Sequence, residues 1–193
     1  MAALYGSRRA RGFSVLELLV VVAVGLVVAA LAMPNVMTAV ANMRLRSATS
    51  NISGLVQDGR MNSVKRNRRT DILFSMQNNA RVLYADFDLS GGFSSSDRAI
   101  QIPATINNTD PASGPGAIPD TTLGFTPDYS NSLPVSFNSR GLPCRFASGT
   151  CTLASFVLYF NETRALGGGW AAVSISRAGR IKTWYWNGNS WAN

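Results

Sequence analysis

Residues 11–19 read RGFSVLELL, and an almost unbroken apolar run continues them to Met33. About 20 consecutive apolar residues are enough to cross a bilayer as a helix. Apart from Glu17, no charged residue occurs between Phe13 and Arg44. We therefore predict a transmembrane helix near the N-terminus.

Three arginines, Arg8, Arg9 and Arg11, precede this run. Lys and Arg close to the ends of a membrane span stay on the cytoplasmic side and set its orientation. The pattern predicts a single-pass membrane protein, with everything after about Val40 outside the cytoplasm.

Glu17 is the acidic residue inside the apolar run. A carboxylate at the centre of a spanning helix costs about 2.5–3.5 kcal/mol on insertion scales, so such residues usually serve a function. Close to the interface the cost is small, and position alone leaves both interpretations open.

Gly12, Phe13 and Glu17 together resemble the processing site of type IV prepilins and of the pseudopilins of type II secretion systems. In that family a prepilin peptidase cuts after the glycine, the new N-terminal Phe is N-methylated, and the glutamate is the fifth mature residue. The resemblance implies cleavage between Gly12 and Phe13 and methylation of Phe13. Pro34 matches a proline of the family and implies a helix kink.

The resemblance also implies that Phe13 and Glu17 carry assembly. The amine freed at Phe13 is a cation that approaches the Glu17 carboxylate of a neighbouring subunit, so that two groups expensive in lipid neutralise each other. Leu16, Leu18 and Val22 would line the contacts between helices. The expected partners are other pilin or pseudopilin subunits, prepilin peptidase, the inner-membrane assembly machinery and membrane lipid.

A rival interpretation starts from Ala30-Leu31-Ala32, an A-x-A site that follows a basic region and an apolar region. This is the pattern of an ordinary secretory signal peptide, whose cleavage would release a soluble domain beginning at Met33. It leaves the Gly-Phe-x-x-x-Glu pattern and the helical continuation past Met33 unexplained.

The chain has 193 residues and a formal net charge of +8. Removing the three arginines of the leader, residues 1–12, leaves +5, so the mature chain stays basic. This charge is compatible with affinity for nucleic acid, with an anionic surface or with solubility alone. The residues after the span suit one domain of ordinary size.

Cys144 and Cys151 lie close together in the segment that we place outside the cytoplasm. Disulfides persist there, so we expect a small bridged loop, with two free thiols as the alternative. A structural zinc site usually needs four Cys or His ligands, and the chain has no histidine. We expect no cofactor.

After the span, five apolar residues recur at the spacing of one helix face: Leu45, Ala48, Ile52, Leu55 and Val56. A helix from Phe13 to about Arg66 would measure about 80 Å, well beyond a bilayer about 30 Å thick. We therefore predict one transmembrane and stalk helix over residues 13–67.

The end of this helix, residues 59–67, reads GRMNSVKRN and resembles the end of the first helix in the GspH/FimT group of minor pilins and pseudopilins. That group usually has alanine where this chain has Gly59. The resemblance implies an α+β, pilin-like fold, in which the long N-terminal helix packs on a C-terminal antiparallel β-sandwich-like domain. Four cations at this end, Lys65, Arg66, Arg68 and Arg69, are also explained by a helix C-terminus.

We assign the β-rich domain to residues 68–193. Seven short segments rich in β-branched or aromatic residues are predicted strands: 71–76, 81–87, 99–102, 133–137, 153–160, 171–176 and 181–186. The first two should form a hairpin through Gln77-Asn78-Asn79. Residues 103–134 lack hydrophobic periodicity and predict a long surface loop.

A partial match to the spacing of a calcium loop begins at Asp86 and includes Asp88, Ser90 and Asp97. Asp97 stands where a bidentate Glu is expected, and no predicted helix flanks the loop. A hairpin turn rich in Asp, Ser and Gly explains the same residues.

Residues 176–186, SRAGRIKTWYW, join a basic turn to an aromatic strand. The turn is similar to the Gly-Arg-x-Arg motif through which some competence minor pilins of this group bind DNA. That similarity implies DNA binding by Arg180, Lys182 and Arg177, with base stacking on Trp184 or Trp186 if either is exposed. Lys182 replaces the second arginine of the motif and lacks its planar fork. Ordinary sheet construction, with Trp184 and Trp186 on the face opposite Ile181 and Tyr185, is the alternative.

A catalytic site is not recognisable in this sequence. The chain has no histidine and no serine in a Gly-x-Ser-x-Gly elbow. We therefore expect a structural subunit of a type IV pilus or a secretion pseudopilus rather than an enzyme. DNA binding for uptake and a soluble domain freed after Ala32 are the alternatives.

Overall fold

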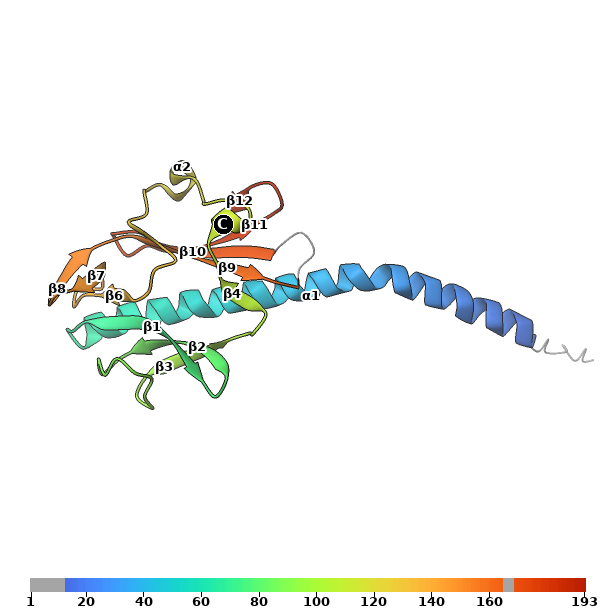
Figure 1. The fold of residues 1–193 in the computed structure, drawn as a ribbon, viewed down its shortest axis with the longest axis horizontal. Coiled ribbons are helices and arrows are strands. Elements are labelled where there is room, and N and C mark those ends of the chain that lie inside the picture. Colours follow the sequence, from blue (N-terminus) through green and yellow to red (C-terminus); the bar gives the residue numbers. More distant parts are fainter. Residues whose placement is uncertain (1–12, 165–168) are drawn as a thin grey trace, which may run out of the picture. The chain divides into compact units, whose positions relative to one another are not determined.

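The computed structural model describes residues 13–164 and 169–193 (Figure 1). Two compact units meet between Met37 and Thr38, and helix α1 (Val15–Lys65) contributes residues to both. We call residues 13–37 the apolar segment and residues 38–193 the β-rich unit, and we describe each by itself.

Helix α1 begins with a side-chain cap. The Ser14 hydroxyl accepts a hydrogen bond from the N–H of Leu16 at 3.3 Å, and the Ser14 carbonyl accepts one from Leu18 at 3.1 Å. Glu17 follows Ser14 by three residues and lies in the first helical turn, the spacing of a capping box. A carboxylate also interacts favourably with the positive end of the helix dipole there.

Pro34 lies inside α1. Proline has no N–H, so it cannot donate to the carbonyl of Ala30, and its ring crowds the preceding turn. The helical assignment nevertheless continues through this position, and the predicted kink stays a prediction.

In the β-rich unit, one face of α1 is buried: Ala41, Leu45, Ala48, Thr49, Ile52, Leu55, Val56, Gly59 and Ser63. These residues recur three or four positions apart, which places them on one stripe of the helix. The five apolar residues predicted to face the domain are all among them, so the predicted stalk face is confirmed.

Six strands form a first antiparallel sheet in the order β3-β2-β1-β6-β7-β8. Their bounds are β1 (Thr70–Gln77), β2 (Ala80–Asp86), β3 (Arg98–Ile102), β6 (Val135–Phe137), β7 (Pro143–Ala147) and β8 (Thr150–Leu153). The predicted β1–β2 hairpin is confirmed, with Gln77 opposite Ala80. Asn78 and Asn79 both have positive φ, as a two-residue type I′ turn requires.

The second sheet has the order β12-β11-β10-β9-β4, and β5 pairs with β9 in parallel. Its strands are β4 (Ile106–Asn108), β5 (Tyr129–Ser130), β9 (Phe156–Glu162), β10 (Gly169–Ile175), β11 (Ile181–Trp186) and β12 (Trp191–Ala192). One core joins the buried face of α1 to both sheets, with Ile52, Ile72 and Leu158 among its fully buried members. The protein thus has the α+β, pilin-like arrangement of a long N-terminal helix packed against antiparallel sheets.

The predicted long loop is partly wrong. Residues 103–134 contain β4, a 3₁₀ turn η1 (Pro111–Ser113), a one-turn helix α2 (Asp120–Leu123) and β5. Ile118 and Leu123 are buried in a second cluster with Tyr159, Trp184 and other side chains of the second sheet. The segment is ordered because this face of the sheet is also apolar and must be covered.

The predicted strand 153–160 is confirmed over residues 156–160, which lie in β9, but its start is wrong, since Leu153 belongs to a strand of the other sheet. β8 ends at Leu153 and β9 begins at Phe156. Between them Ser155 donates from its hydroxyl to the carboxylate of Asp128 at 2.7 Å, and Ala154 donates its N–H to the carbonyl of Pro143 at 3.1 Å. These contacts fix the crossover from one sheet to the other. Strands β7 and β12 were not predicted.

Candidate functional site

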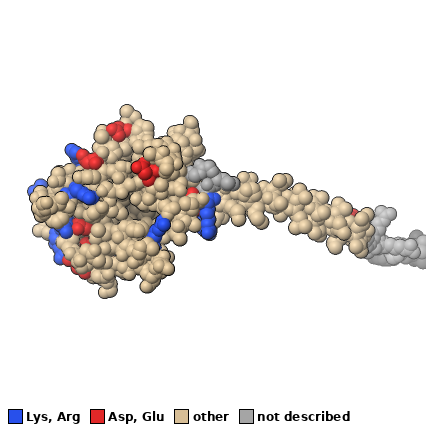
Figure 2. Space-filling view, in the orientation of Figure 1, with Lys and Arg blue, Asp and Glu red and all other residues tan. Residues whose placement is uncertain are grey.

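The apolar segment exposes its large side chains on all sides within the described chain. Leu16 is 72% exposed, Leu18 61% and Val22 53%, against near-complete burial of the apolar residues of α1 that face the sheets. Figure 2 shows this stretch as an almost unbroken uncharged surface. α1 is long and apolar enough to cross a membrane, and none of the residues in its most apolar stretch is buried within the protein. An exposed apolar surface of this size needs lipid or other chains around it.

Phe13 and Glu17 lie at the start of this segment, and both are exposed. Phe13 is 74% exposed and precedes the first helical residue by two positions. Gly12, the residue before the predicted cleavage point, lies outside the described residues together with Arg8, Arg9 and Arg11. Glu17 stands at the spacing of a capping box with Ser14 of its own chain, and its pairing with another subunit stays a prediction.

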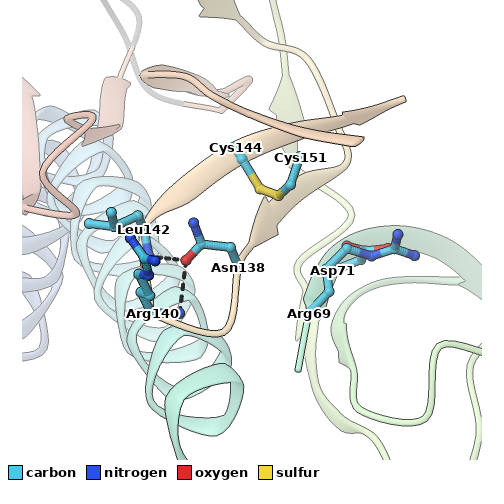
Figure 3. The surroundings of a disulfide bond; sticks show 7 residues. All are labelled: Arg69, Asp71, Asn138, Arg140, Leu142, Cys144 and Cys151. Atoms are coloured by element: carbon cyan, nitrogen blue, oxygen red, sulfur yellow. Dashed lines mark hydrogen bonds and ion pairs between the residues drawn. A yellow bond between two sulfur atoms is a disulfide. The ribbon is translucent and has the colours of Figure 1, made fainter. Parts of the chain in front are cut away.

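Cys144 and Cys151 form a disulfide bond, as the sequence predicts (Figure 3). Cys144 lies on β7 and Cys151 on β8, so the bond crosses the hairpin that closes one edge of the first sheet. In the preceding turn, the Asn138 side-chain oxygen accepts hydrogen bonds from the N–H groups of Arg140 and Leu142, at 2.9 and 3.1 Å. A disulfide bond and the hydrogen bonds of Asn138 therefore both stabilise this edge of the sheet.

The predicted DNA-binding residues lie on the turn between β10 and β11, residues 176–180, and at the start of β11. The guanidinium of Arg177 forms a bidentate ion pair with the carboxylate of Asp128, from the segment before β5. Hydrogen bonds from Arg177 and from Ser155 hold the pKa of Asp128 well below its usual range. Arg177 is therefore engaged in an ion pair within its own chain. It differs in this from Arg180 and Lys182, the other two predicted DNA-binding cations.

Arg180 is exposed, and the ammonium of Lys182 lies 5.0 Å from the centre of the Trp184 ring. Trp184 is only 2% exposed, and its indole N–H donates to the hydroxyl of Ser174 at 2.8 Å. The predicted alternation of β11 is confirmed, because Ile181 and Tyr185 pack against the core with α1 and Trp184 and Trp186 belong to the other cluster. Trp184 is thus not available for stacking on a base.

Arg60 connects α1 to two turns, a role that the sequence did not indicate. Its Nε donates to the carbonyl of Gly141 at 3.0 Å, and its Nη1 donates to the carbonyl of Gly179 at 2.8 Å. Both glycines have positive φ, and a Cβ on Gly179 would lie 3.0 Å from Cζ of Arg60. The signals in the sequence that could have indicated this role are the two turn glycines, Gly141 and Gly179, and the arginine within the GRMNSVKRN stretch.

The carboxylates of Asp86, Asp88 and Asp97 converge, with one oxygen of each within 4.8 Å of the others. The loop itself supplies donors to all three. Asp86 accepts from the N–H of Leu89 at 2.6 Å, and Asp97 accepts from the N–H of Phe87 at 2.9 Å.

The serines complete this network. The hydroxyls of Ser94 and Ser96 donate to Asp88 at 3.0 and 2.8 Å, while Ser90 donates its hydroxyl to the carbonyl of Gly92. Burial raises the pKa of Asp86, and hydrogen bonds from Ser90 and Ser96 lower that of Asp88. These bonds account for the clustering as an Asp/Ser/Gly turn, and calcium binding stays a prediction.

Comparison with known families gives one match. Residues 7–33 match the family described as the prokaryotic N-terminal methylation motif. No curated protein and no solved structure matches the chain. The motif supports a type IV pilin-like protein, which implies cleavage by a prepilin peptidase and assembly with other pilin subunits. The long apolar helix is consistent with anchoring in the inner membrane.

Proposed function

We propose that this protein is a minor pilin or pseudopilin, of the kind found in the GspH/FimT group, and that it has no enzymatic activity. Cleavage after Gly12 frees Phe13, which is then N-methylated. The apolar segment enters the core of a type IV pilus or of a type II secretion pseudopilus, and the β-rich unit faces the periplasm or the outside.

The observation that carries this proposal is the exposure of the apolar segment together with the methylation motif, whose match covers residues 7–33 and thus most of that segment. A segment whose leucines and valines are more than half exposed within its own chain must be covered by lipid before assembly and by neighbouring helices after it. Glu17 is the one charged side chain of this segment, at the helix end where Phe13 would begin the mature chain.

The order of elements supports the finer assignment. A stalk helix is followed by antiparallel sheets, and the helix ends with the Lys65-Arg66-Asn67 run on which the resemblance to the GspH/FimT group rests. Asn67 has φ +50° and its N–H donates to the carbonyl of Val64, so this residue closes the helix by a left-handed cap. The helix therefore ends at a defined residue, shortly before β1 begins at Thr70.

The deciding experiment is intact mass measurement and N-terminal sequencing of the protein purified from membranes of a host with a prepilin peptidase. We expect a chain that begins at N-methylated Phe13. A Gly12→Val variant, which blocks cleavage at this site, should keep its leader. A mature chain that begins at Met33 would show signal-peptide cleavage after Ala32 and a soluble product, and would overturn the proposal.

DNA binding for uptake is a separate prediction that no contact among the described residues favours over the structural role. Arg177 is paired with Asp128, and Trp184 is buried. Neither Arg180 nor Lys182 forms an ion pair among the described residues, so both can contact phosphate, in which case binding should weaken steeply with salt.

A further inference from the structure

A groove of about 680 Å³ lies between the last turns of α1 and the turn between β10 and β11. Gln57, Met61 and Val64 line it from the helix, and Gly179 and Ile181 line it from the turn and β11. The groove lies entirely within the β-rich unit and is remote in sequence from the apolar segment.

The floor of this groove is apolar and open to solvent. Met61 is 70% exposed and Val64 is 52% exposed, although the opposite face of the same helical turns is buried against the sheets. Ile181 is half-buried beside them. Large apolar side chains that gather in a concave site, with polar groups around them, are typical of a surface that binds another molecule.

The rim of the groove carries three cations, Arg60, Lys65 and Arg180. Among the described residues, no carboxylate lines the groove, and neither Lys65 nor Arg180 takes part in an ion pair. Arg60 is held by two carbonyl groups and keeps its net charge. The occupant that complements this rim is therefore negatively charged.

The two walls of the groove are joined before anything binds. Arg60 extends from the helix to the carbonyl of Gly179 on the opposite wall, at 2.8 Å. The helix end is fixed as well, since the N–H of Arg68 donates to the carbonyl of Ser63 at 3.1 Å. A preformed groove loses little conformational entropy when a ligand binds.

We propose that this groove binds an acidic peptide segment of another protein, in which an apolar side chain stands between carboxylates. The apolar side chain covers Met61 and Val64, and the carboxylates pair with Lys65 and Arg180. A nucleic acid fits less well, because no aromatic side chain among the described residues lines the groove for base stacking. Phosphates alone would leave the apolar floor uncovered. The proposal concerns the isolated subunit and does not depend on filament assembly.

The test is a fluorescence anisotropy titration of the full chain in uncharged detergent micelles. The probe is a labelled, end-blocked peptide of sequence ELDLE. The control peptides are ESDSE, which keeps the charges, and KLKLK, which keeps the apolar side chains. We expect ELDLE to bind with a Kd below about 1 mM, and at least about tenfold more tightly than either control. Added salt should weaken binding.

Two variants assign the binding to the groove. Lys65→Glu with Arg180→Glu reverses the charge of the rim, and Met61→Ser removes apolar surface from the floor at an exposed position. Each should weaken ELDLE binding by about tenfold or more. Arg164→Glu changes an exposed arginine in the turn after β9 that does not line the groove, and binding should be unchanged. If the double reversal lowers the melting temperature, Lys65→Gln with Arg180→Gln replaces it.

Three results would overturn the proposal. The absence of ELDLE binding up to about 1 mM removes it directly. Equal binding of ELDLE and ESDSE shows that the apolar floor is not used. Tighter binding of a short DNA duplex than of ELDLE, lost in the variants of Lys65 and Arg180, assigns the rim to phosphate instead.

Discussion

The Nη1 group of Arg60 and the carbonyl oxygen of Gly179 lie 2.8 Å apart, although 119 residues separate them along the chain. The same guanidinium donates to the carbonyl of Gly141 at 3.0 Å. One side chain of the stalk helix thus holds a turn from each of the two sheets. A planar guanidinium suits this role because its donors diverge in fixed directions.

Arg60→Ala should therefore lower the free energy of unfolding of the β-rich unit by about 2 kcal/mol, since two carbonyl groups lose a charged donor. Arg60→Lys should lower it by an intermediate amount, because an ammonium keeps the charge but not the fork. All four tryptophans, Trp170, Trp184, Trp186 and Trp191, lie in this unit, so urea unfolding followed by their fluorescence reports on it. Arg44→Ala, at an exposed position of the same helix, is the matched control and should change little.

A substitution of Gly141 tests whether the turn between β6 and β7 must lie close to α1. Its φ is +72°, and a Cβ there would lie 2.7 Å from Cγ2 of Val64. Gly149, with φ +81°, has no atom within 4 Å of such a Cβ. Gly149→Ala should therefore cost only backbone strain, about 1 kcal/mol, whereas Gly141→Ala should cost at least about 1 kcal/mol more. Equal losses in urea unfolding would show that the helix is not a close neighbour of this turn.

The buried face of α1 and the first hairpin could be predicted because their signals are local. Leu45, Ile52 and Val56 show the helix period, and Asn78-Asn79 forms the turn that two adjacent strands need. The cover over the second sheet could not, because Ile118 and Leu123 are isolated in a stretch without periodicity. They are buried because they pack on the apolar outer face of the second sheet, whose strands are distant from them in the sequence.

The candidate site divides in the same way. Phe13 and Glu17 form a pattern within five residues, so the sequence alone identifies them. The pairing of Arg177 with Asp128 joins residues 49 positions apart, and nothing local to either residue indicates it. The sequence of the turn between β10 and β11 predicts three cations available to a ligand, but one of them, Arg177, is already in an ion pair.

The disulfide between Cys144 and Cys151 should stabilise the β-rich unit modestly, because its loop is short. The two cysteines are seven positions apart, and the chain-entropy relation gives about 2–3 kcal/mol for a loop of this length. Cys144→Ala with Cys151→Ala should lower the stability to urea by about that amount. A reductant should lower the stability of the wild type and leave that of the double variant unchanged; an equal effect of reductant on both would contradict this account.

Asp128 should make stability depend on pH in the acidic range. Its pKa in the folded protein is lowered by Arg177 and Ser155, so its contribution is fully present above its unfolded pKa of about 4 and is lost as pH falls below that value. Asp128→Asn should be less stable than the wild type at pH 7, and the difference should shrink between about pH 5 and about pH 3. Asp120→Asn, a change at an exposed aspartate, provides the control. A constant difference across this range would argue against the ion pair.

Two predicted roles of Glu17 can be separated by substitution. Within its own chain it stands three residues after Ser14, where Gln serves nearly as well as Glu in a capping box. In an assembled filament its charge would neutralise the amine of Phe13 on a neighbouring subunit, where Gln cannot replace it. Glu17→Gln should therefore leave the mature protein folded, cleaved and in the membrane, yet reduce its incorporation into filaments by about tenfold or more.

Glu17→Leu should also reduce incorporation, whereas Val21→Leu, at another exposed position of the same helix, should assemble normally. Quantitative immunoblotting of sheared filaments against the membrane fraction measures this ratio. Wild-type incorporation of the Gln and Leu variants would contradict the predicted pairing of Glu17 with Phe13, and would mean that the apolar surface alone brings the subunits together.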